Sequence, residues 1–327
     1  MAKEMSTGDF YRAFEERYRG PRELIKSRLR VYIPFIEPLK SAYIEHKAID
    51  LGCGRGEWLE LLQELGYDAR GVDLDDQMLA ACRQLGLKVQ TEDAIGFLKA
   101  LPNESQLVVS AFHFVEHIPF ADLQTLVQEA LRVLRPGGLL IMETPNPENI
   151  VVGTTNFYLD PTHQRPIPPQ LLSFLPEYYG FFQVKILRLQ EPEELASGKA
   201  PSLLNVFNGV SPDYAVVAQK GGDESAIVAK RKAFATEYGL TLENLAARYD
   251  AQAESRATEA ESHAAEAEAR ATEAVARATE AESRATEAEA RATQAEACFN
   301  DVINSTSWKI TRPLRAARRA FQQLLER

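Results

Sequence analysis

Residues 156 to 169 read NFYLDPTHQRPIPP, and this stretch gathers more hydrogen-bonding side chains than an ordinary connection needs. Asn, Tyr, Asp, His and Arg follow one another closely, and three prolines then restrict the backbone. Binding residues are concentrated on loops that a rigid scaffold positions. The composition indicates the lining of a pocket, and it suits a polyhydroxylated ligand better than an apolar one.

A second group of residues is the glycine loop AIDLGCGRGEW, residues 48 to 58. An apolar strand is predicted to end in Asp50, after which Gly52, Gly54 and Gly56 allow a sharp turn and a close approach of the backbone to a ligand. The G-x-G-x-G spacing differs from the G-x-G-x-x-G of dinucleotide-binding loops, which favours another nucleotide-like cofactor. Asp73 closes the next predicted strand roughly 20 residues further on, where a carboxylate can bind both hydroxyls of a ribose.

These residues need elements that position them, and the sequence predicts an α/β fold over residues 46–220. Strand-like and helix-like segments alternate, which is typical of a parallel sheet covered by helices on both faces. Strands are expected over residues 47–50, 69–74, 107–112 and 139–144, the last after a turn RPGG, and over two closing segments, antiparallel to each other, at 181–189 and 213–220. Helices are expected over residues 57–65, 77–85 and 120–134.

Residues 1–45 are predicted to form a helical cap of two helices that breaks near Gly20 and Pro21. Arg19 and Arg22 lie at this break. They are candidates for binding the carboxylate of a cofactor, and the alternative is that both are solvated surface charges.

Composition and charge limit the classes of function that the chain can have. The chain has 327 residues and a formal net charge of −10, which argues against non-specific nucleic-acid binding because that needs Lys and Arg to displace counterions. Cys53, Cys82 and Cys298 are widely spaced, so we expect reduced thiols and neither a disulfide framework nor a metal site. The N-terminus lacks an apolar core of signal-peptide type and no run is long enough to span a bilayer. We therefore expect a cytoplasmic protein, unless its surface docks on a membrane.

After a helical linker, residues 221–252, the chain repeats with a period of seven, as in RATEAES, RATEAVA and RATEAEA. Alanines from Ala257 to Ala295, at alternating steps of three and four, form the a and d positions of a predicted coiled coil over residues 253–302. Arg then falls at g and Glu mostly at e, and Glu–Arg pairs four residues apart support each helix. A strict period of seven predicts a left-handed supercoil, roughly 70 Å long. The alternative is a solitary, charge-stabilised helix, because alanine seams bury little apolar surface.

The last segment, residues 303–327, includes SWKITRPLRAARRAFQQLLER and is basic. Pro313 can open a helix, and the apolar residues that follow share one face: Leu314, Ala317, Phe321 and Leu324. A basic amphipathic helix with Trp308 nearby can lie on an anionic membrane or dock on a partner. The alternative is a solvated helix end that packs on the coil.

The motifs DLGCGRG, GVDLD, EDA, FHFVEHI and RVLRPGG, in this order over residues 48 to 144, resemble those of the class I S-adenosylmethionine-dependent methyltransferases. The resemblance implies a Rossmann-like, doubly wound fold and S-adenosylmethionine (SAM) as cofactor. Asp50 and the three glycines would flank its methionine part, and Asp73 would bind its ribose. The resemblance further implies contacts to adenine from Leu74, Asp93 and Ala94, and contacts near the sulfonium from Phe112 and His113. Strand four of this family often opens with Asp, where this chain has Gln106, at a structural position.

In this fold the methyl group faces the loops after strands four and five, so the loop 156–169 is expected to line the acceptor pocket. A hydroxyl acceptor must lose its proton, and a neutral histidine can take it. His163 and His117 are the candidate bases, with Asp160 or Glu116 able to orient an imidazole. The alternatives are that His163 bonds the loop to itself and that His117 packs beside the cofactor. The candidate acceptor contacts are Glu143, Asn146, Asn156, Tyr158, Asp160 and Arg165.

The combination of this domain with a coiled coil and the tail SWKITRPLR resembles the bacterial O-antigen chain-terminating methyltransferases. The resemblance implies methylation of a hydroxyl on the non-reducing terminal sugar of a polysaccharide, with the coiled coil as an oligomerising spacer, commonly trimeric. It also implies that the C-terminus brings the enzyme to the inner face of the cytoplasmic membrane and to a glycan polymerase. Some members carry a kinase domain, but this sequence has no Gly-rich kinase loop, H-R-D or D-F-G.

Two other interpretations are open. In the first, the acceptor of the methyl group is a quinone precursor or a tRNA base. The acidic charge of the chain argues against tRNA, and neither acceptor explains a long heptad array. Alternatively the chain is a non-catalytic scaffold or length ruler, against which the intact glycine loop, Asp73 and the polar loop argue.

Overall fold

The computed structural model describes residues 20–222 and 230–325. The chain separates into two compact units, Met1–Gln252 and Ala253–Arg327, each described by itself below. The predicted helix before Gly20, with Phe10, Phe14 and Arg19, lies outside the described residues.

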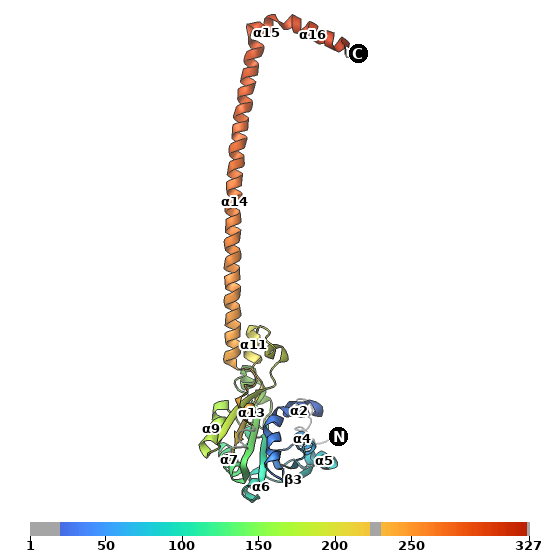
Figure 1. The fold of residues 1–327 in the computed structure, drawn as a ribbon, viewed down its shortest axis with the longest axis vertical. Coiled ribbons are helices and arrows are strands. Elements are labelled where there is room, and N and C mark those ends of the chain that lie inside the picture. The colour runs from blue at the N-terminus through green and yellow to red at the C-terminus, as the bar shows by residue number, and fades with distance from the viewer. Residues whose placement is uncertain (1–19, 223–229, 326–327) are drawn as a thin grey trace, which may run out of the picture. The chain divides into compact units, whose positions relative to one another are not determined.

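The first unit is built on a seven-stranded sheet with the order β3-β2-β1-β4-β5-β7-β6 (Figure 1). The strands are β1 (Lys47–Leu51), β2 (Asp68–Asp73), β3 (Lys88–Thr91), β4 (Gln106–Phe112), β5 (Leu134–Pro145), β6 (Gln183–Leu189) and β7 (Asp213–Gln219). The first five run parallel, and β7 runs antiparallel to both β5 and β6. The predicted doubly wound α/β fold, with its antiparallel closing strands, is therefore confirmed.

Helices cover both faces of this sheet (Figure 1). The α-helices of the first unit are α2 (Arg22–Leu29), α3 (Ile33–Ile36), α4 (Glu57–Glu64), α5 (Asp76–Gln84), α6 (Ala94–Ala100), α7 (Phe120–Val133), α8 (Ile150–Thr154), α9 (Pro169–Tyr179), α10 (Glu193–Ala196), α11 (Leu203–Asn208) and α13 (Arg231–Ala235). Short 3-10 helices are η1 (Arg30–Tyr32), η2 (Glu37–Ser41), η3 (Val115–His117) and η4 (Asn156–Leu159).

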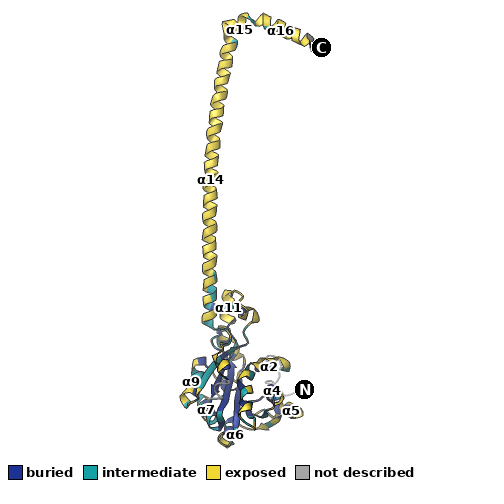
Figure 2. Cartoon of the chain, viewed as in Figure 1, coloured by how far each residue is buried: buried dark blue, intermediate teal, exposed yellow. Residues whose placement is uncertain are grey.

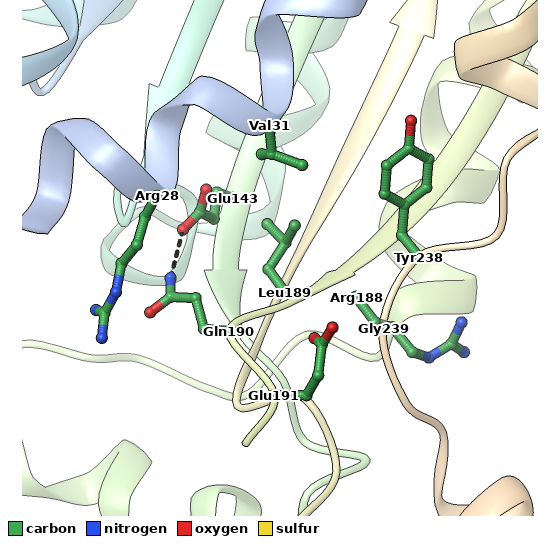
Figure 3. A pocket seen from close by; sticks show the side chains of 9 residues that line it. All are labelled: Arg28, Val31, Glu143, Arg188, Leu189, Gln190, Glu191, Tyr238 and Gly239. Carbon is green, nitrogen blue, oxygen red and sulfur yellow. Dashed lines mark hydrogen bonds between the residues drawn. The ribbon is translucent and has the colours of Figure 1, made fainter. Parts of the chain in front are cut away.

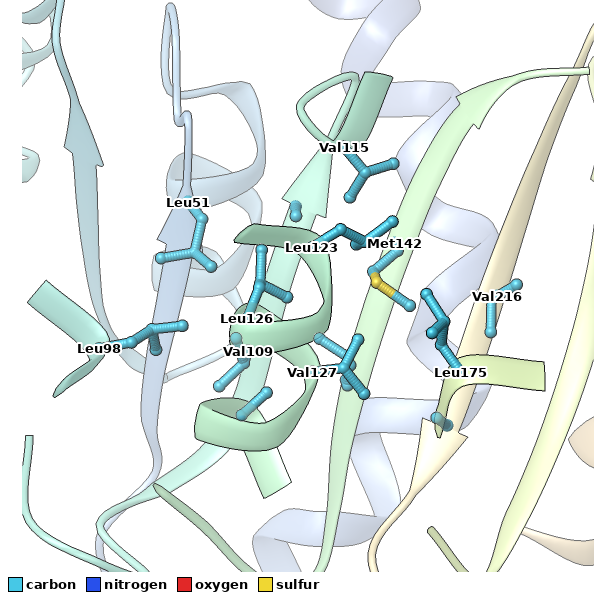
Figure 4. Close-up of a cluster of buried hydrophobic side chains, with 14 of the residues drawn as sticks. Leu51, Leu98, Val109, Val115, Leu123, Leu126, Val127, Met142, Leu175 and Val216 are labelled. Carbon is cyan, nitrogen blue, oxygen red and sulfur yellow. The ribbon is translucent and has the colours of Figure 1, made fainter. Parts of the chain in front are cut away.

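Alternation along β5 divides the core between the two faces. Leu140 and Met142 pack with α6, α7 and α9, whereas Leu139 and Ile141 pack with α4 and the N-terminal helices α2 and α3. Successive strand residues point to opposite faces, and here both faces are buried. Figure 4 shows the first cluster, where α7 contributes Leu123 among others. Because both faces are filled, polar side chains collect at the carboxyl ends of the strands.

Two expectations about the strands need correction. The segment RPGG was predicted to be a turn, but β5 begins at Leu134 and runs through it, with a register shift against β4 between Gln106 and Val108. Strand β3 was not anticipated, because a short edge strand with three exposed or half-buried polar residues carries little apolar pattern.

The N-terminal cap is held by charge as well as by packing. Lys26 is buried, and its Nζ lies 2.9 Å from Glu60 Oε1 and 2.6 Å from Glu64 Oε1 on α4. Tyr32 and Phe35 are fully buried against the sheet. The cap is therefore part of the core of the first unit.

The helix α14 (Leu242–Asn304) contains the whole heptad array, followed by α15 (Thr306–Ile310) and α16 (Arg312–Leu325). The four predicted Glu–Arg pairs form, for example Arg270–Glu266 at 3.3 Å and Arg291–Glu287 at 3.5 Å. Figure 2 shows that the heptad residues are exposed in the single chain. Pro313 is the second residue of α16, as expected. Within the described residues, no helix has the length and apolarity to cross a bilayer.

Candidate active site

A cavity of about 970 Å³ lies at the carboxyl ends of β1, β2, β4 and β5. This volume is at the upper end of the range of ligand pockets, roughly 300–1,000 Å³. Residues from the glycine loop, from the ends of β2 and β4, and from the loop 156–169 line it together. The structure therefore joins the two sequence stretches that carried the chemical prediction.

The glycine loop turns in backbone conformations that favour glycine. Gly52, Gly54 and Gly56 have φ values of 66°, 49° and 76°. A Cβ on Gly52 would lie 2.6 Å from Phe114, whereas a Cβ on Gly56 would lie 2.7 Å from Leu87. Gly52 and Gly54 line the cavity, but Gly56 does not. Gly56 instead opens α4 and lets the loop pack on α5.

Backbone donors hold Asp73 and Asp93, the carboxylates predicted to bind ribose and adenine. Asp73 Oδ2 accepts from the Gly54 amide at 2.9 Å, and Oδ1 accepts from the Asp75 amide at 2.9 Å. Asp93 caps α6 through the Gly96 amide at 2.7 Å. Leu74 lines the cavity, and 74% of its surface is exposed. Its apolar side chain is therefore free to pack against a flat ring of a ligand.

The centre of the cavity carries Asp50, Trp58 and Phe112. Asp50 is buried and accepts from the Ser110 hydroxyl at 2.7 Å. Phe112 packs against Trp58 and Tyr32, with ring centroids 5.3 Å from each. The buried Trp58 Nε1 has no hydrogen-bond partner among the described residues.

His113, which follows β4, is surrounded by carboxylates. Its Nδ1 lies 3.4 Å from Glu116 Oε1, and its Nε2 lies 3.5 Å from Glu143 Oε1. Burial lowers the pKa of His113, but the hydrogen bonds to these two groups and the charge of Asp213 outweigh it, so the pKa lies well above its usual value. Its backbone is left-handed, with φ 48°, a strained conformation for a non-glycine residue. The two acids therefore favour the protonated form of the imidazole between them.

Glu143 links this group to the N-terminal cap. It accepts a hydrogen bond from the fully buried Tyr32 hydroxyl and one at 3.3 Å from Gln190 Nε2. Burial, with the neighbouring Glu143 charge, raises the pKa of Tyr32 well above its usual value, so its hydroxyl stays a donor. Asp213 also lines the cavity, and burial raises its pKa to about 6.

The loop 156–169 folds onto η3 beside Glu116. His117 Nδ1 lies 2.8 Å from Thr162 Oγ1, which lies 2.6 Å from Asp160 Oδ1. His163 Nδ1 lies 2.6 Å from the Phe157 carbonyl, and the two imidazole centroids are 4.7 Å apart. Burial lowers the pKa of His117, which keeps this ring neutral near pH 7.

The cavity gathers many of the predicted residues and leaves others out. It is lined by Asp50, Gly52, Gly54, Asp73, Leu74, Asp93, Ala94, Phe112, His113, His117, Glu143, Asn156, Asp160 and His163. Asn146 is instead fully buried and donates to the Ser211 carbonyl at 2.8 Å. Tyr158 is exposed outside the cavity, and Arg165 stacks over Phe120 at 4.7 Å. Arg22 pairs with Glu60 at 2.7 Å rather than lining the cavity.

Sequence reasoning missed cavity residues that come from distant segments. Arg28, Thr162, Gln190 and Asp213 line the cavity, and Tyr32 supports it from behind. Thr162 lies in the loop 156–169, two residues after the predicted contact Asp160, and this spacing could have indicated it. Arg28 and Gln190 carried no local motif.

A smaller cavity of about 210 Å³ shares Arg28, Glu143 and Gln190 with the large one. Figure 3 shows these side chains with Leu189 and Glu191 at the end of β6. Gln190 has φ 65°, so its backbone is also strained. The site therefore has a recess beyond Glu143.

Two groups could hold a metal ion by spacing alone. Ligand atoms lie within 4.8 Å of one another in Glu116, His117 and His163, and likewise in His113, Glu143 and Asp213. His113 lies between Glu116 and Glu143 and, when protonated, balances their charge without an ion.

The large cavity fits SAM. Its lining carries the carboxylates of Asp50, Asp73, Asp93 and Glu143, and SAM brings a sulfonium and an ammonium, so the charges are complementary. The exposed Leu74 can cover adenine, and Asp73 has lone pairs left for ribose hydroxyls.

The fold and this cavity define a class I methyltransferase. The family described as "Methyltransferase domain" matches residues 49–142. The crystal structure of a SAM dependent methyltransferase from Archaeoglobus fulgidus is 37% identical, with a TM-score of 0.57, and the match covers 65% of this chain and 100% of that one. The chain therefore belongs to the SAM-dependent methyltransferases, and its cofactor is SAM.

Curated relatives match part of the chain. A ubiquinone biosynthesis O-methyltransferase from Methylococcus capsulatus is 32% identical over 124 residues, which are 34% of this chain and 51% of that protein. A probable S-adenosylmethionine-dependent methyltransferase from Mycolicibacterium smegmatis is 32% identical over 133 residues, 41% of this chain and 51% of that protein. The chain thus spans about half the length of these relatives.

Proposed function

We propose that the protein transfers a methyl group from SAM to a hydroxyl of a sugar, at the non-reducing terminal residue of an O-antigen or related surface polysaccharide. The observation that carries this proposal is the polar wall that residues 156–163 contribute to the cavity. Asn156, Asp160, Thr162 and His163 line the same cavity as Asp73 and Gly52. Such side chains suit a ligand with many hydroxyls, since each buried hydroxyl needs a hydrogen-bond partner.

SAM supplies an electrophilic methyl group on a sulfonium, and the chain must align the acceptor oxygen with it. The charged cluster of His113, Glu116 and Glu143 and the wall 156–163 form the side of the cavity where the acceptor is placed in this proposal. A sugar hydroxyl is a poor nucleophile until its proton is removed. His117 and His163 are the proposed proton acceptors, since both line the cavity next to one another.

The second unit has a proposed role in assembly and placement. The heptad array in α14 would join copies of the chain, with a trimer favoured, and would act as a spacer between the growing glycan end and its polymerase. The helix α16 is basic, with Leu314 and Phe321 largely exposed, which supports docking on an anionic inner membrane surface or on a glycan polymerase. Cosedimentation with vesicles that contain anionic lipid, compared with neutral vesicles, tests the membrane version. Equal recovery with both would contradict it.

A second candidate is O-methylation of a small quinone precursor. The named ubiquinone relatives favour it, and the cavity also exposes Phe114, Ile118 and Leu159. An aromatic acceptor would use these apolar side chains, while leaving the polar wall unexplained.

The test is methyl transfer from labelled SAM to undecorated O-polysaccharide from a strain lacking this gene, beside a catechol-type quinone precursor. Label on the terminal sugar, and loss of transfer in His117→Ala and His163→Ala, is the expected result. Label on the phenol alone would replace the sugar proposal by the second candidate. SAM binding without transfer to either acceptor would contradict both.

A further inference from the structure

Hydrogen-bond directions around Thr162 are fixed by what Asp160 can do. Asp160 Oδ1 accepts from the Thr162 amide at 2.8 Å and lies 2.6 Å from the Thr162 hydroxyl oxygen. Burial acts to raise the pKa of Asp160, but the hydrogen bonds from the Thr162 hydroxyl and amide outweigh it and the pKa is lowered, so the group is a carboxylate and only accepts. The single hydroxyl proton of Thr162 therefore points at Asp160.

This direction determines the tautomer of His117. With its proton directed to Asp160, Thr162 Oγ1 offers a lone pair to His117 Nδ1 at 2.8 Å, so Nδ1 carries a proton. A neutral imidazole with Nδ1–H has its lone pair on Nε2. The backbone around the ring is held as well, because the Gln164 amide donates to the Glu116 carbonyl at 2.9 Å and Gln164 Nε2 donates to the His117 carbonyl at 2.9 Å.

His163 differs because both of its nitrogens face acceptor oxygens. Its Nδ1 lies 2.6 Å from the Phe157 carbonyl, and its Nε2 lies 3.9 Å from Asp160 Oδ2 and 4.0 Å from Glu116 Oε1. Its Nδ1 therefore donates to the loop, and its side chain is only 11% exposed. It also packs against Phe157 with centroids 4.5 Å apart, which fits a structural part in the wall.

We propose that His117 is the proton acceptor of the methyl transfer and that Thr162, anchored on Asp160, is its positioning residue. The proposal rests on the proposed function for the kind of acceptor. As the acceptor oxygen bonds to the methyl carbon, the carbon–sulfur bond breaks with its electron pair on sulfur, and the hydroxyl proton moves to His117 Nε2. The sulfonium becomes a neutral thioether and the imidazole becomes an imidazolium, so one positive charge is present before and after the step. The Nδ1–H of that imidazolium points to Thr162 and, through it, to the Asp160 carboxylate.

The charged groups that face His117 are Glu116 and His113 from η3 and the end of β4, and Asp160 and His163 from the loop. A substitution of Thr162 leaves all four in place. Thr162→Val keeps the shape and the backbone amide that bonds Asp160, and removes only the hydroxyl. Thr162→Ser restores the hydroxyl. Thr125→Val is the matched control, since the Thr125 hydroxyl on α7 bonds only the Ala121 carbonyl at 3.0 Å and lies outside the cavity.

The first measurement is ¹⁵N NMR of the histidine rings in the full chain with bound SAM, which requires no acceptor. The expected result is a His117 signal of the Nδ1–H tautomer in the unsubstituted protein and in Thr162→Ser, and a mixture of tautomers in Thr162→Val. An Nε2–H tautomer in the unsubstituted protein, or an unchanged ratio in Thr162→Val, would overturn the proposal whatever the acceptor is.

The second measurement is the pH profile of kcat/KM with the acceptor that the labelling experiment identifies. Thr162→Val should lower kcat about 10- to 100-fold with little change in the KM for SAM, because oriented proton transfer contributes about 10²- to 10⁴-fold. Its acidic limb should move to lower pH, since the imidazolium loses the Thr162–Asp160 acceptor, and Thr162→Ser should restore the profile. A kcat loss with no shift of the limb would indicate a merely structural Thr162. Loss of activity on chelation by EDTA would also overturn the proposal, because an ion would then occupy the Nε2 lone pair.

Discussion

The carboxylates of the cavity differ in their hydrogen-bond donors and burial, and these differences set the charge that each one carries. Asp73 and Asp93 accept from backbone amides, which fixes each group without neutralising its charge. Burial instead raises the pKa of Asp213 to about 6, which favours its neutral form below that pH. The backbone-held carboxylates are therefore at the end of the cavity predicted for ribose and adenine, and Asp213 lies with His113 and Glu143.

Replacing Asp73 by Asn should weaken SAM binding about 10- to 100-fold. The charge is lost, and an amide NH₂ would face the Gly54 or Asp75 amide, whereas hydrogen bonds to a charged group contribute about 1.5–3 kcal/mol. Isothermal titration with SAM measures the change. Asp76→Asn is the control, since Asp76 lies exposed on α5 and pairs with Arg83. Equal affinities in the two variants would contradict the assignment of Asp73.

The raised pKa of Asp213 predicts a pH-dependent stability. Its folded pKa of about 6 lies above the ordinary 3.8, so the stability that the neutral carboxyl retains is present below pH 4 and is lost as the pH rises through 6. Asn at this position, facing His113, Glu143, Arg28 and Glu116, should raise the unfolding temperature above pH 6. The gain is at most about 3 kcal/mol at 1.36 kcal/mol per pKa unit, and partial exposure reduces it.

Thermal unfolding at pH 4, 5, 6, 7 and 8 measures this difference between the parent chain and Asp213→Asn. The two curves should converge at pH 4. Asp122→Asn, on the exposed side of α7, should follow the parent at every pH. An Asn variant that is less stable than the parent at pH 8 would show that Asp213 is needed as an anion.

At the scale of residues, the sequence predicts the cavity residues that belong to a local motif. It does not predict those that reach the cavity only through tertiary packing. Asp50, Gly52, Gly54 and Asp73 follow from one strand-turn-helix-strand unit. Tyr32 reaches Glu143 across 111 residues of sequence, and no spacing rule connects them.

At the scale of elements, the site depends on turns that hold each strand end in place. Gly56 opens α4 in the left-handed region and lets α5 approach, with Cys82 Sγ 3.0 Å and Leu87 Cδ1 2.7 Å from where a Cβ would be. The position of the glycine loop is therefore set by the packing of α4 against α5 as well as by the turn itself. Strand alternation was predicted because buried strands have dense apolar runs, whereas β3 and the RPGG part of β5 lack that signal.

Two glycines with similar backbone conformations but different surroundings allow the cost of backbone strain to be measured apart from the cost of overpacking. Gly56 and Gly66 have φ of 76° and 82°, yet nothing lies within 4 Å of a Cβ on Gly66. Gly66→Ala should cost about 1–2 kcal/mol from the left-handed backbone alone. Gly56→Ala should cost about 1–3 kcal/mol more, from overpacking against Leu87 and Cys82. Urea unfolding measures both, and equal midpoints would contradict the packing role of Gly56.

At the scale of the whole molecule, the first unit contains the catalytic cavity and the second unit contains a surface that one chain cannot bury. The heptad alanines are exposed, and the Glu–Arg pairs along the helix stabilise it without a partner. The sequence predicted the helix because its repeat is strictly periodic. It did not determine whether chains associate or in what number, because both depend on seam packing between chains.

Association through the alanine seam can be tested with two matched pairs of substitutions. Ala267 and Ala274 are at predicted d positions, and Ala269 and Ala276 are at f positions on the opposite face of the same helix. Lys is a good helix former, so both double variants keep α14, but only Ala267→Lys with Ala274→Lys places charges in the seam. The parent chain of 36.5 kDa should sediment as an oligomer, with a trimer favoured. The f-position variant should keep the parent mass and the d-position variant should dissociate. Identical masses for the two variants would mean that the alanine seam does not join the chains, and a parent that sediments at 36.5 kDa would leave α14 as a solitary helix.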